Sequence, residues 1–92
     1  MTRTTSHAVG PSEPSVLDLT IGEALRRAAE NVPDRAALIE GLHDANARRT
    51  WTYAQFYEAA IRTARALLAR FEPGDNIAVW AHNVPEWALL EF

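Results

Sequence analysis

Three histidines are the side chains of this sequence that could bind a metal ion or carry a proton in catalysis. His7, His43 and His82 are far apart and show no H-x-x-x-H spacing, the pattern that brings two imidazoles to one metal ion. His82 follows an apolar run, Asn76–Ala81, that we predict to be a strand, and open α/β sheets bind ligands at the carboxyl ends of their strands. The simpler interpretation is that His82 orders the turn after that strand. We therefore predict no metal-binding residue.

Tryptophans and paired arginines could instead recognise a base, a sugar or a phosphate. Trp51, Trp80 and Trp87 could form a stacking platform, but Trp80 lies inside the apolar run and Trp87 in the first turn of a predicted helix. We expect all three to pack in a core. Arg48 and Arg49 could hold a phosphate, although two arginines beside a predicted hairpin are more simply explained as solvated side chains.

The motifs that mark nucleotide-binding and hydrolytic sites are absent from the sequence. There is no G-x-G-x-x-G, no G-x-x-x-x-G-K-[ST] and no nucleophile elbow, and the acidic residues are dispersed. The sequence has no Cys, which excludes disulfides and thiolate metal sites. We therefore assign no catalytic and no cofactor-binding residue to these 92 residues.

Length and composition are those of one small globular domain: 92 residues, 48% hydrophobic and 23% charged. A net charge of −3 without a basic cluster argues against nucleic acid as a partner. No apolar run approaches the ~20 residues of a transmembrane helix. The first fifteen residues lack the apolar stretch of a secretory signal. We expect a cytoplasmic protein without a transmembrane segment.

The elements that must position any site begin after a tail. Residues 1–18 are rich in Ser, Thr and Pro and bury little, so we expect a flexible tail, with the ordered domain at 19–92. Thr20–Asn31 is a predicted helix with a capping box from Thr20 to Glu23, and Pro33 ends it.

A hairpin and a long helix follow. Ala36–Glu40 and Arg49–Thr52 are predicted antiparallel strands, joined by a polar loop. Thr52–Phe71 is a predicted helix with a capping box from Thr52 to Gln55. Its predicted buried stripe consists of Phe56, Ala60, Ala64, Leu67, Leu68 and Phe71.

The last part of the chain predicts a buried strand and the start of a helix. The unbroken apolar run Asn76–Ala81 is typical of a strand covered on both faces. We expect Asn83 to cap the last helix in a box with Glu86, and Pro85 to lie in its first turn. The fold class is therefore α/β, with an incomplete sheet. Because the last helix has only about two turns and an apolar end, we expect the chain to be part of a longer protein.

Three segments in this order resemble the N-terminus of AMP-forming acyl-CoA synthetases, members of the adenylate-forming (AMP-binding) superfamily. They are V-P-D-R-A-A-L after the first helix, T-W-T-Y-A-Q-F at the start of the long helix, and P-G-D-N-I-A-V with N-V-P-E-W near the end. The resemblance covers Leu19 to Phe92 and is strongest to medium- and long-chain fatty-acyl-CoA ligases.

The resemblance implies the first part of a large two-domain enzyme that uses ATP, Mg²⁺ and CoA. Such enzymes activate a carboxylic acid as an acyl-adenylate and transfer the acyl group to CoA. The family's phosphate-binding loop, metal-binding motif and catalytic lysine have no counterpart before Phe92, so we expect these 92 residues alone to be inactive. Two alternatives stay open: an adenylating enzyme that loads a carrier protein, and a small non-catalytic α/β scaffold.

Overall fold

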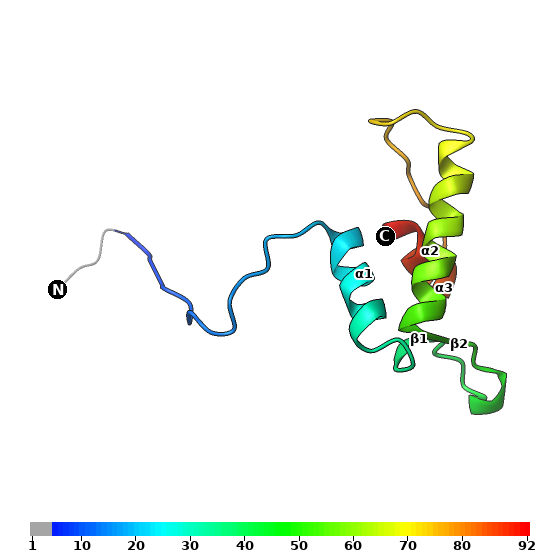
Figure 1. The fold of residues 1–92 in the computed structure, drawn as a ribbon, viewed down its shortest axis with the longest axis horizontal. Helices are drawn as coiled ribbons and strands as arrows, with labels where there is room; N and C mark the ends of the chain where they lie inside the picture. The colour runs from blue at the N-terminus through cyan, green and yellow to red at the C-terminus, as the bar shows by residue number, and fades with distance from the viewer. Residues whose placement is uncertain (1–4) are drawn as a thin grey trace.

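A computed structural model describes residues 5–92 as an α/β body with an extended arm (Figure 1). The expected α/β class is confirmed: the part of the chain that the structure describes contains three helices and a two-stranded antiparallel sheet, which lies at one end of α2. The elements in chain order are α1 (Ile21–Asn31), β1 (Ala36–Ile39), a 3-10 turn (Ala45–Ala47), β2 (Thr50–Thr52), α2 (Tyr53–Leu68) and α3 (Pro85–Glu91). No helix of residues 5–92 is long and apolar enough to cross a membrane.

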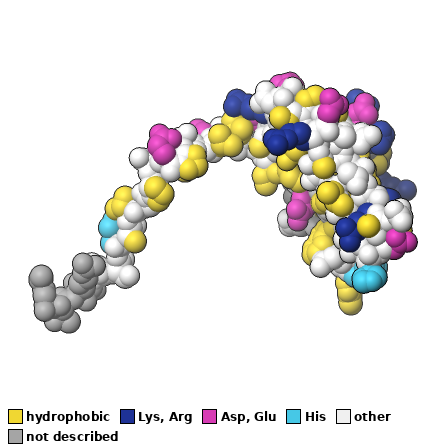
Figure 2. Space-filling view, turned by 90° about the horizontal axis from the view of Figure 1, so that it is seen from below, with side chains coloured by type: hydrophobic (Ala, Val, Ile, Leu, Met, Phe, Trp, Pro, Cys, Tyr) yellow, Lys and Arg dark blue, Asp and Glu magenta, His cyan; other side chains and the backbone are white. Residues whose placement is uncertain are grey.

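The arm, residues 5–19, has no regular secondary structure and runs away from the body (Figures 1 and 2). Its apolar side chains are exposed, with Val16 at 96% and Leu17 at 68%, and only Leu19 is half-buried. The tail predicted for residues 1–18 overlaps this segment, and its first four residues lie outside the described residues.

Helix α1 begins at the predicted cap but with half of the predicted capping box. The Thr20 hydroxyl accepts a hydrogen bond of 3.2 Å from the backbone N–H of Glu23. The Glu23 carboxylate does not reach back to Thr20, because it pairs with Arg26 on the next turn. The prediction that the Glu23 side chain would accept a hydrogen bond from the Thr20 N–H was therefore wrong.

The hairpin predicted before α2 is confirmed. Strands β1 and β2 are antiparallel, with Ala36 opposite Thr52 and Ile39 opposite Thr50. An irregularity between Ala36 and Leu38 shifts the register by one residue. The backbone N–H of Tyr53 donates to the Arg35 carbonyl at 2.9 Å, so the hairpin leads directly into α2.

Helix α2 carries the complete capping box predicted from its sequence. The Thr52 hydroxyl accepts from the Gln55 N–H at 3.2 Å, and the Gln55 side chain accepts from the Thr52 N–H at 2.9 Å. Its first half supplies the core, where Phe56 and Ala60 pack with Leu25 of α1. Around these three lie partly buried side chains of the hairpin, of the first turns of α2 and of α3: Ala37, Leu38, Trp51, Tyr53, Tyr57, Ala88 and Leu89.

The prediction of a buried stripe was wrong for its second half, from Ala64 to Phe71. Helix α2 ends at Leu68 rather than Phe71, and these two side chains are 66% and 40% exposed. Ala64 is exposed as well, and Leu67 is half-buried. The helix periodicity placed these residues on one face, but α1 and the hairpin cover only the N-terminal half of that face.

The strand predicted at Asn76–Ala81 does not form. These residues have no regular structure and are exposed, with Trp80 at 103% and Ile77 at 46%. A strand needs the edge of a neighbour for its backbone hydrogen bonds, and the sheet within residues 5–92 contains only β1 and β2. The turn before this segment has the expected conformation at Gly74. Its φ of 92° is positive, which glycine adopts without strain.

Helix α3 starts without the predicted cap. Its N-cap is Val84 rather than Asn83, and no side chain there accepts a backbone hydrogen bond. Pro85 occupies the first turn as expected. The carboxylate of Glu86, predicted to complete a capping box, instead binds Arg49.

Candidate functional site

A groove between the hairpin and α3 is the candidate site. It has a volume of about 310 Å³ and is open to solvent on one side. One wall is Leu38–Gly41 and the other is formed by the start and inner face of α3. The full lining is Leu38, Ile39, Glu40, Gly41, Asn83, Val84, Pro85, Trp87, Ala88 and Glu91. Its floor is apolar, and its polar groups are two carboxylates and one amide.

Arg49 lies beside this groove and binds two carboxylates: Glu40, which lines it, and Glu86, which lies between the lining residues Pro85 and Trp87. Its Nη1 donates to Glu86 Oε1 at 2.7 Å. Its Nη2 and Nε donate to Glu40 Oε2 at 2.7 and 3.2 Å. The guanidinium also lies 5.2 Å from the ring centroid of Trp51, at cation–π distance.

Arg49 keeps the two carboxyl groups that it binds in their ionised form. Hydrogen bonding from Arg49, followed by its charge, holds the pKa of Glu40 below the ordinary value of 4.5 against an opposing effect of burial. Hydrogen bonding from Arg49 lowers the pKa of Glu86 as well. Both carboxylates are therefore ionised at neutral pH and cannot act as general acids there.

A second hollow, of about 450 Å³, is lined by Val32, Arg35, Ala36 and Tyr53. It combines one guanidinium with one phenol but no nucleophile or carboxylate. We assign no chemistry to it.

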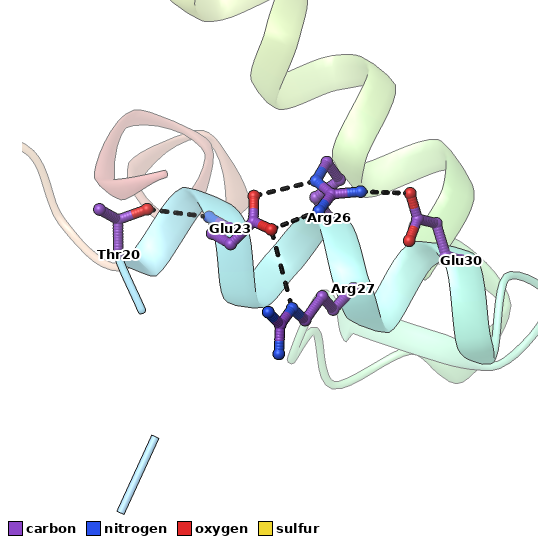
Figure 3. A network of polar contacts seen from close by, with 5 residues as sticks. All are labelled: Thr20, Glu23, Arg26, Arg27 and Glu30. Carbon is purple, nitrogen blue, oxygen red and sulfur yellow. Dashed lines mark hydrogen bonds and ion pairs between the residues drawn. The ribbon is translucent and has the colours of Figure 1, made fainter. Parts of the chain in front are cut away.

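The other polar network lies along α1 (Figure 3). Arg26 binds Glu23 and Glu30, with its Nε 2.9 Å from Glu23 Oε2, and Arg27 lies 3.7 Å from Glu23 Oε1. These are contacts three and four residues apart on one exposed helix face, the spacing that stabilises an isolated helix. Because the network consists of contacts within one helix, we give it a structural role.

The structure does not bring the histidines together. His7 is exposed on the arm, His43 in the hairpin loop, and His82 after the exposed segment 76–81. Among residues 5–92 no group of three His, Cys, Asp or Glu side chains could hold a metal ion. The described chain also offers no phosphate-binding loop, so we assign none of its residues to ATP or Mg²⁺.

The burial of the tryptophans and the partners of the arginines differ in part from what the sequence predicted. Trp51 is half-buried against the core, as expected. Trp80 is fully exposed and Trp87 is 38% exposed at the groove, so the core positions predicted for these two were wrong. Arg48 donates to the Leu42 carbonyl at 2.6 Å within its own loop. Arg49, expected to be merely solvated, is the residue that sequence reasoning missed.

The contact of Arg49 with Glu40 could have been predicted from the sequence, but its contact with Glu86 could not. Glu40 and Arg49 occupy facing positions one step beyond the pair Ile39 and Thr50, so a hairpin register would have predicted their contact. Glu86 lies 37 residues later in the chain, and no local pattern connects it to Arg49.

Comparison with known proteins identifies the family. The family described as AMP-binding enzyme matches residues 25–92, which include the core, the hairpin, α2, α3 and the Arg49 cluster. The chain belongs to the AMP-binding enzyme family. This confirms the resemblance drawn from the three sequence segments.

Several curated relatives support the same family. The chain is 39% identical to YngI of Bacillus subtilis (strain 168), named as an acyl-CoA synthetase, over 79% of this chain and 13% of the relative. It is 32% identical to the mitochondrial medium-chain acyl-CoA ligase ACSF2 of Danio rerio, over 99% of this chain and 14% of the relative. It is 33% identical to the acyl-CoA ligase SID4 of Ajellomyces capsulatus, over 90% of this chain and 14% of the relative. The chain thus spans 13–14% of the length of these relatives, and no solved structure matches it.

Proposed function

We propose that this AMP-binding family chain is the N-terminal part of an ATP-dependent acyl-CoA synthetase. The observation that supports the proposal is the family match over residues 25–92 together with relatives named acyl-CoA synthetases or ligases. In the proposed reaction a carboxylate attacks ATP to give an acyl-adenylate and pyrophosphate. The thiol of CoA then displaces AMP to form the thioester.

The proposed domain organisation places residues 19–92 at the beginning of a large N-terminal AMP-binding domain, with a flexible arm before it. The family match starts at Leu25, inside α1, which supports a boundary close to the start of that helix. The exposure of the arm supports a tail that contributes nothing to the core.

We propose that the 92 residues alone catalyse neither step. The groove and the Arg49 cluster offer ionised carboxylates and a guanidinium, but no nucleophile, no lysine and no phosphate-binding loop. ATP, Mg²⁺ and CoA would then bind residues of the longer protein outside this chain.

The proposed substrate is a medium- or long-chain fatty acid. The name of the Danio rerio relative, a medium-chain acyl-CoA ligase, supports the shorter range. The acceptor is proposed to be CoA, and a carrier protein is the alternative. A cytoplasmic location stays a prediction from composition, to be checked by imaging a tagged full-length protein.

The test compares two proteins: the 92-residue chain and the full open reading frame that contains it. ATP–pyrophosphate exchange is measured with acids of six to eighteen carbons, and thioester formation with CoA or with a phosphopantetheinylated carrier protein. We expect exchange and acyl-CoA only from the longer protein. Exchange by the 92-residue chain would contradict its proposed inactivity. Adenylation without a CoA thioester would favour the carrier-protein alternative.

A further inference from the structure

Arg49 joins the two walls of the groove between β1 and α3. Glu40 belongs to the first wall, and Glu86 lies between Pro85 and Trp87, which line the second. One guanidinium binds both carboxylates, at 2.7 Å each. The distance between the walls at this end of the groove is therefore spanned by a single side chain.

No other polar contact connects these walls. Within residues 5–92, the bond from Arg49 to Glu86 is the one hydrogen bond or ion pair between the hairpin and α3. The apolar face of α3 packs on the core through Ala88 and Leu89, beside Phe56 of α2. That packing holds α3 to the body, and within residues 5–92 the polar contact of its first turn with the hairpin is the bond to Arg49.

The first turn of α3 has little local support of its own. The helix has seven residues, and its N-cap Val84 has no side-chain acceptor for the free backbone donors. A helix this short is marginal without tertiary contacts. The segment before it, residues 76–84, has no regular structure that could fix its start.

Arg49 is itself held in place from two sides. Two of its nitrogens bind Glu40, whose side chain is only 14% exposed, and its guanidinium lies over Trp51. An arginine held in this way loses less side-chain freedom when it binds a further carboxylate. The hairpin therefore presents a preorganised cation to the first turn of α3.

We propose that Arg49 is a positioning residue that fixes the first turn of α3 against the hairpin and so sets the width of the groove between them. This inference does not depend on the proposed ligase activity. It assigns a role to the residues around the groove and leaves the groove's occupant open.

The test measures amide hydrogen exchange of the 92-residue chain by NMR, with separate values for the hairpin, α2 and α3. Glu86→Ala removes the bridge and leaves the pair of Arg49 with Glu40. We expect the amides of Trp87–Glu91 to exchange about 1.5- to 5-fold faster, the range typical of an exposed ion pair. The amides of Glu40 and of α2 should keep their wild-type rates.

Two further variants make the result specific. Arg49→Met should speed α3 exchange as Glu86→Ala does, and should also raise the carboxyl pKa of Glu86 towards 4.5 in an NMR titration. Arg49→Lys should restore part of the α3 protection, because an ammonium on a flexible chain cannot bind both carboxylates in the same forked geometry. Arg48→Met is the matched control and should change neither quantity, because the Arg48 side chain binds the Leu42 carbonyl of its own loop.

Two outcomes would overturn the proposal. The first is unchanged α3 exchange in Glu86→Ala. The second is equally faster exchange in α1, α2 and α3, which would show a general loss of stability rather than a local release of α3. If Arg49→Met does not fold, Glu86→Ala alone still decides between these outcomes.

Discussion

The ring of Phe92 meets the ring of Phe56 edge-to-face, with centroids 5.3 Å apart and planes at 80°. Phe56 is 5% exposed in the centre of the core, whereas Phe92 follows the last turn of α3 and is 43% exposed. The backbone carbonyl of Phe92 also lies beside Gly22, where a Cβ would be 3.6 Å away. This residue therefore brings the end of α3 to both α1 and α2.

We predict a measurable coupling between these two rings. Phe92→Leu keeps an apolar side chain but loses the aromatic edge contact, and Phe56→Leu does the same from the core. A double-mutant cycle by urea denaturation should give a coupling free energy of about 0.5–1.5 kcal/mol. Phe71→Leu, at the exposed end of the α2 stripe, is the control and should change little. Additive effects of Phe56→Leu and Phe92→Leu would contradict an energetically significant ring contact.

The capping box of α2 gives a second prediction. Thr52→Ala removes the acceptor for the Gln55 N–H at the start of the helix that carries the core. We expect the free energy of unfolding to fall by about 1 kcal/mol, measured as a lower urea midpoint at constant slope. Thr5→Ala, on the exposed arm, is the matched control and should leave the midpoint unchanged. A Thr52→Ala midpoint equal to wild type would show that the cap contributes nothing.

A third prediction concerns the loss of folding stability at low pH. The pKa values of Glu23, Glu40 and Glu86 are lowered in the folded protein, each chiefly by a hydrogen bond from an arginine. A lowered folded pKa stabilises the protein above the unfolded value and loses that effect as the pH falls through the folded value. Unfolding free energy should therefore be flat between pH 7 and about 5 and should fall below about 4.5.

The acid prediction has its own control. Arg49→Met should remove the part of this pH dependence that comes from Glu40 and Glu86 and leave the part from Glu23. High salt should weaken all three contributions, because the pairs are partly exposed. Stability that increases on acidification from pH 5 to pH 3.5 would be the opposite of the expected sign.

Local signals explain what the sequence predicted correctly. An N-cap hydrogen bond spans three residues, so Thr20 and Thr52 marked the starts of α1 and α2 without knowledge of the rest of the fold. The turn at Gly74 and the hairpin were equally local. The family resemblance also rested on short segments, and the match over residues 25–92 confirmed it.

Predictions that depended on distant partners were the ones that failed. The helix period assigned Leu68 and Phe71 to a buried face but could not tell how far the neighbouring elements extend along it. The apolar run Asn76–Ala81 indicated burial without naming the strand that it would pair with. At the candidate site, the sequence suggested Arg49 only as a solvated charge, because Glu86 meets it through the packing of α3 and not through chain proximity.

The last prediction uses this exposed run to separate the 92-residue chain from the longer protein. Trp80 is 103% exposed, so Trp80→Ser should change the unfolding free energy of the chain by less than about 0.5 kcal/mol. It should also reduce self-association in light scattering, since it removes an exposed apolar surface. Trp51→Ser, which alters a half-buried ring against the core, should destabilise the same chain by a larger amount.

The same substitution should behave differently in the proposed full-length synthetase. If residues 76–81 form a covered strand there, Trp80→Ser should destabilise the longer protein by about 3 kcal/mol or more, the usual cost of truncating a buried aromatic side chain. The measurement is the urea midpoint of both proteins, each with Trp51→Ser as its internal reference. A Trp80→Ser effect as small in the longer protein as in the 92-residue chain would contradict a buried strand at this position.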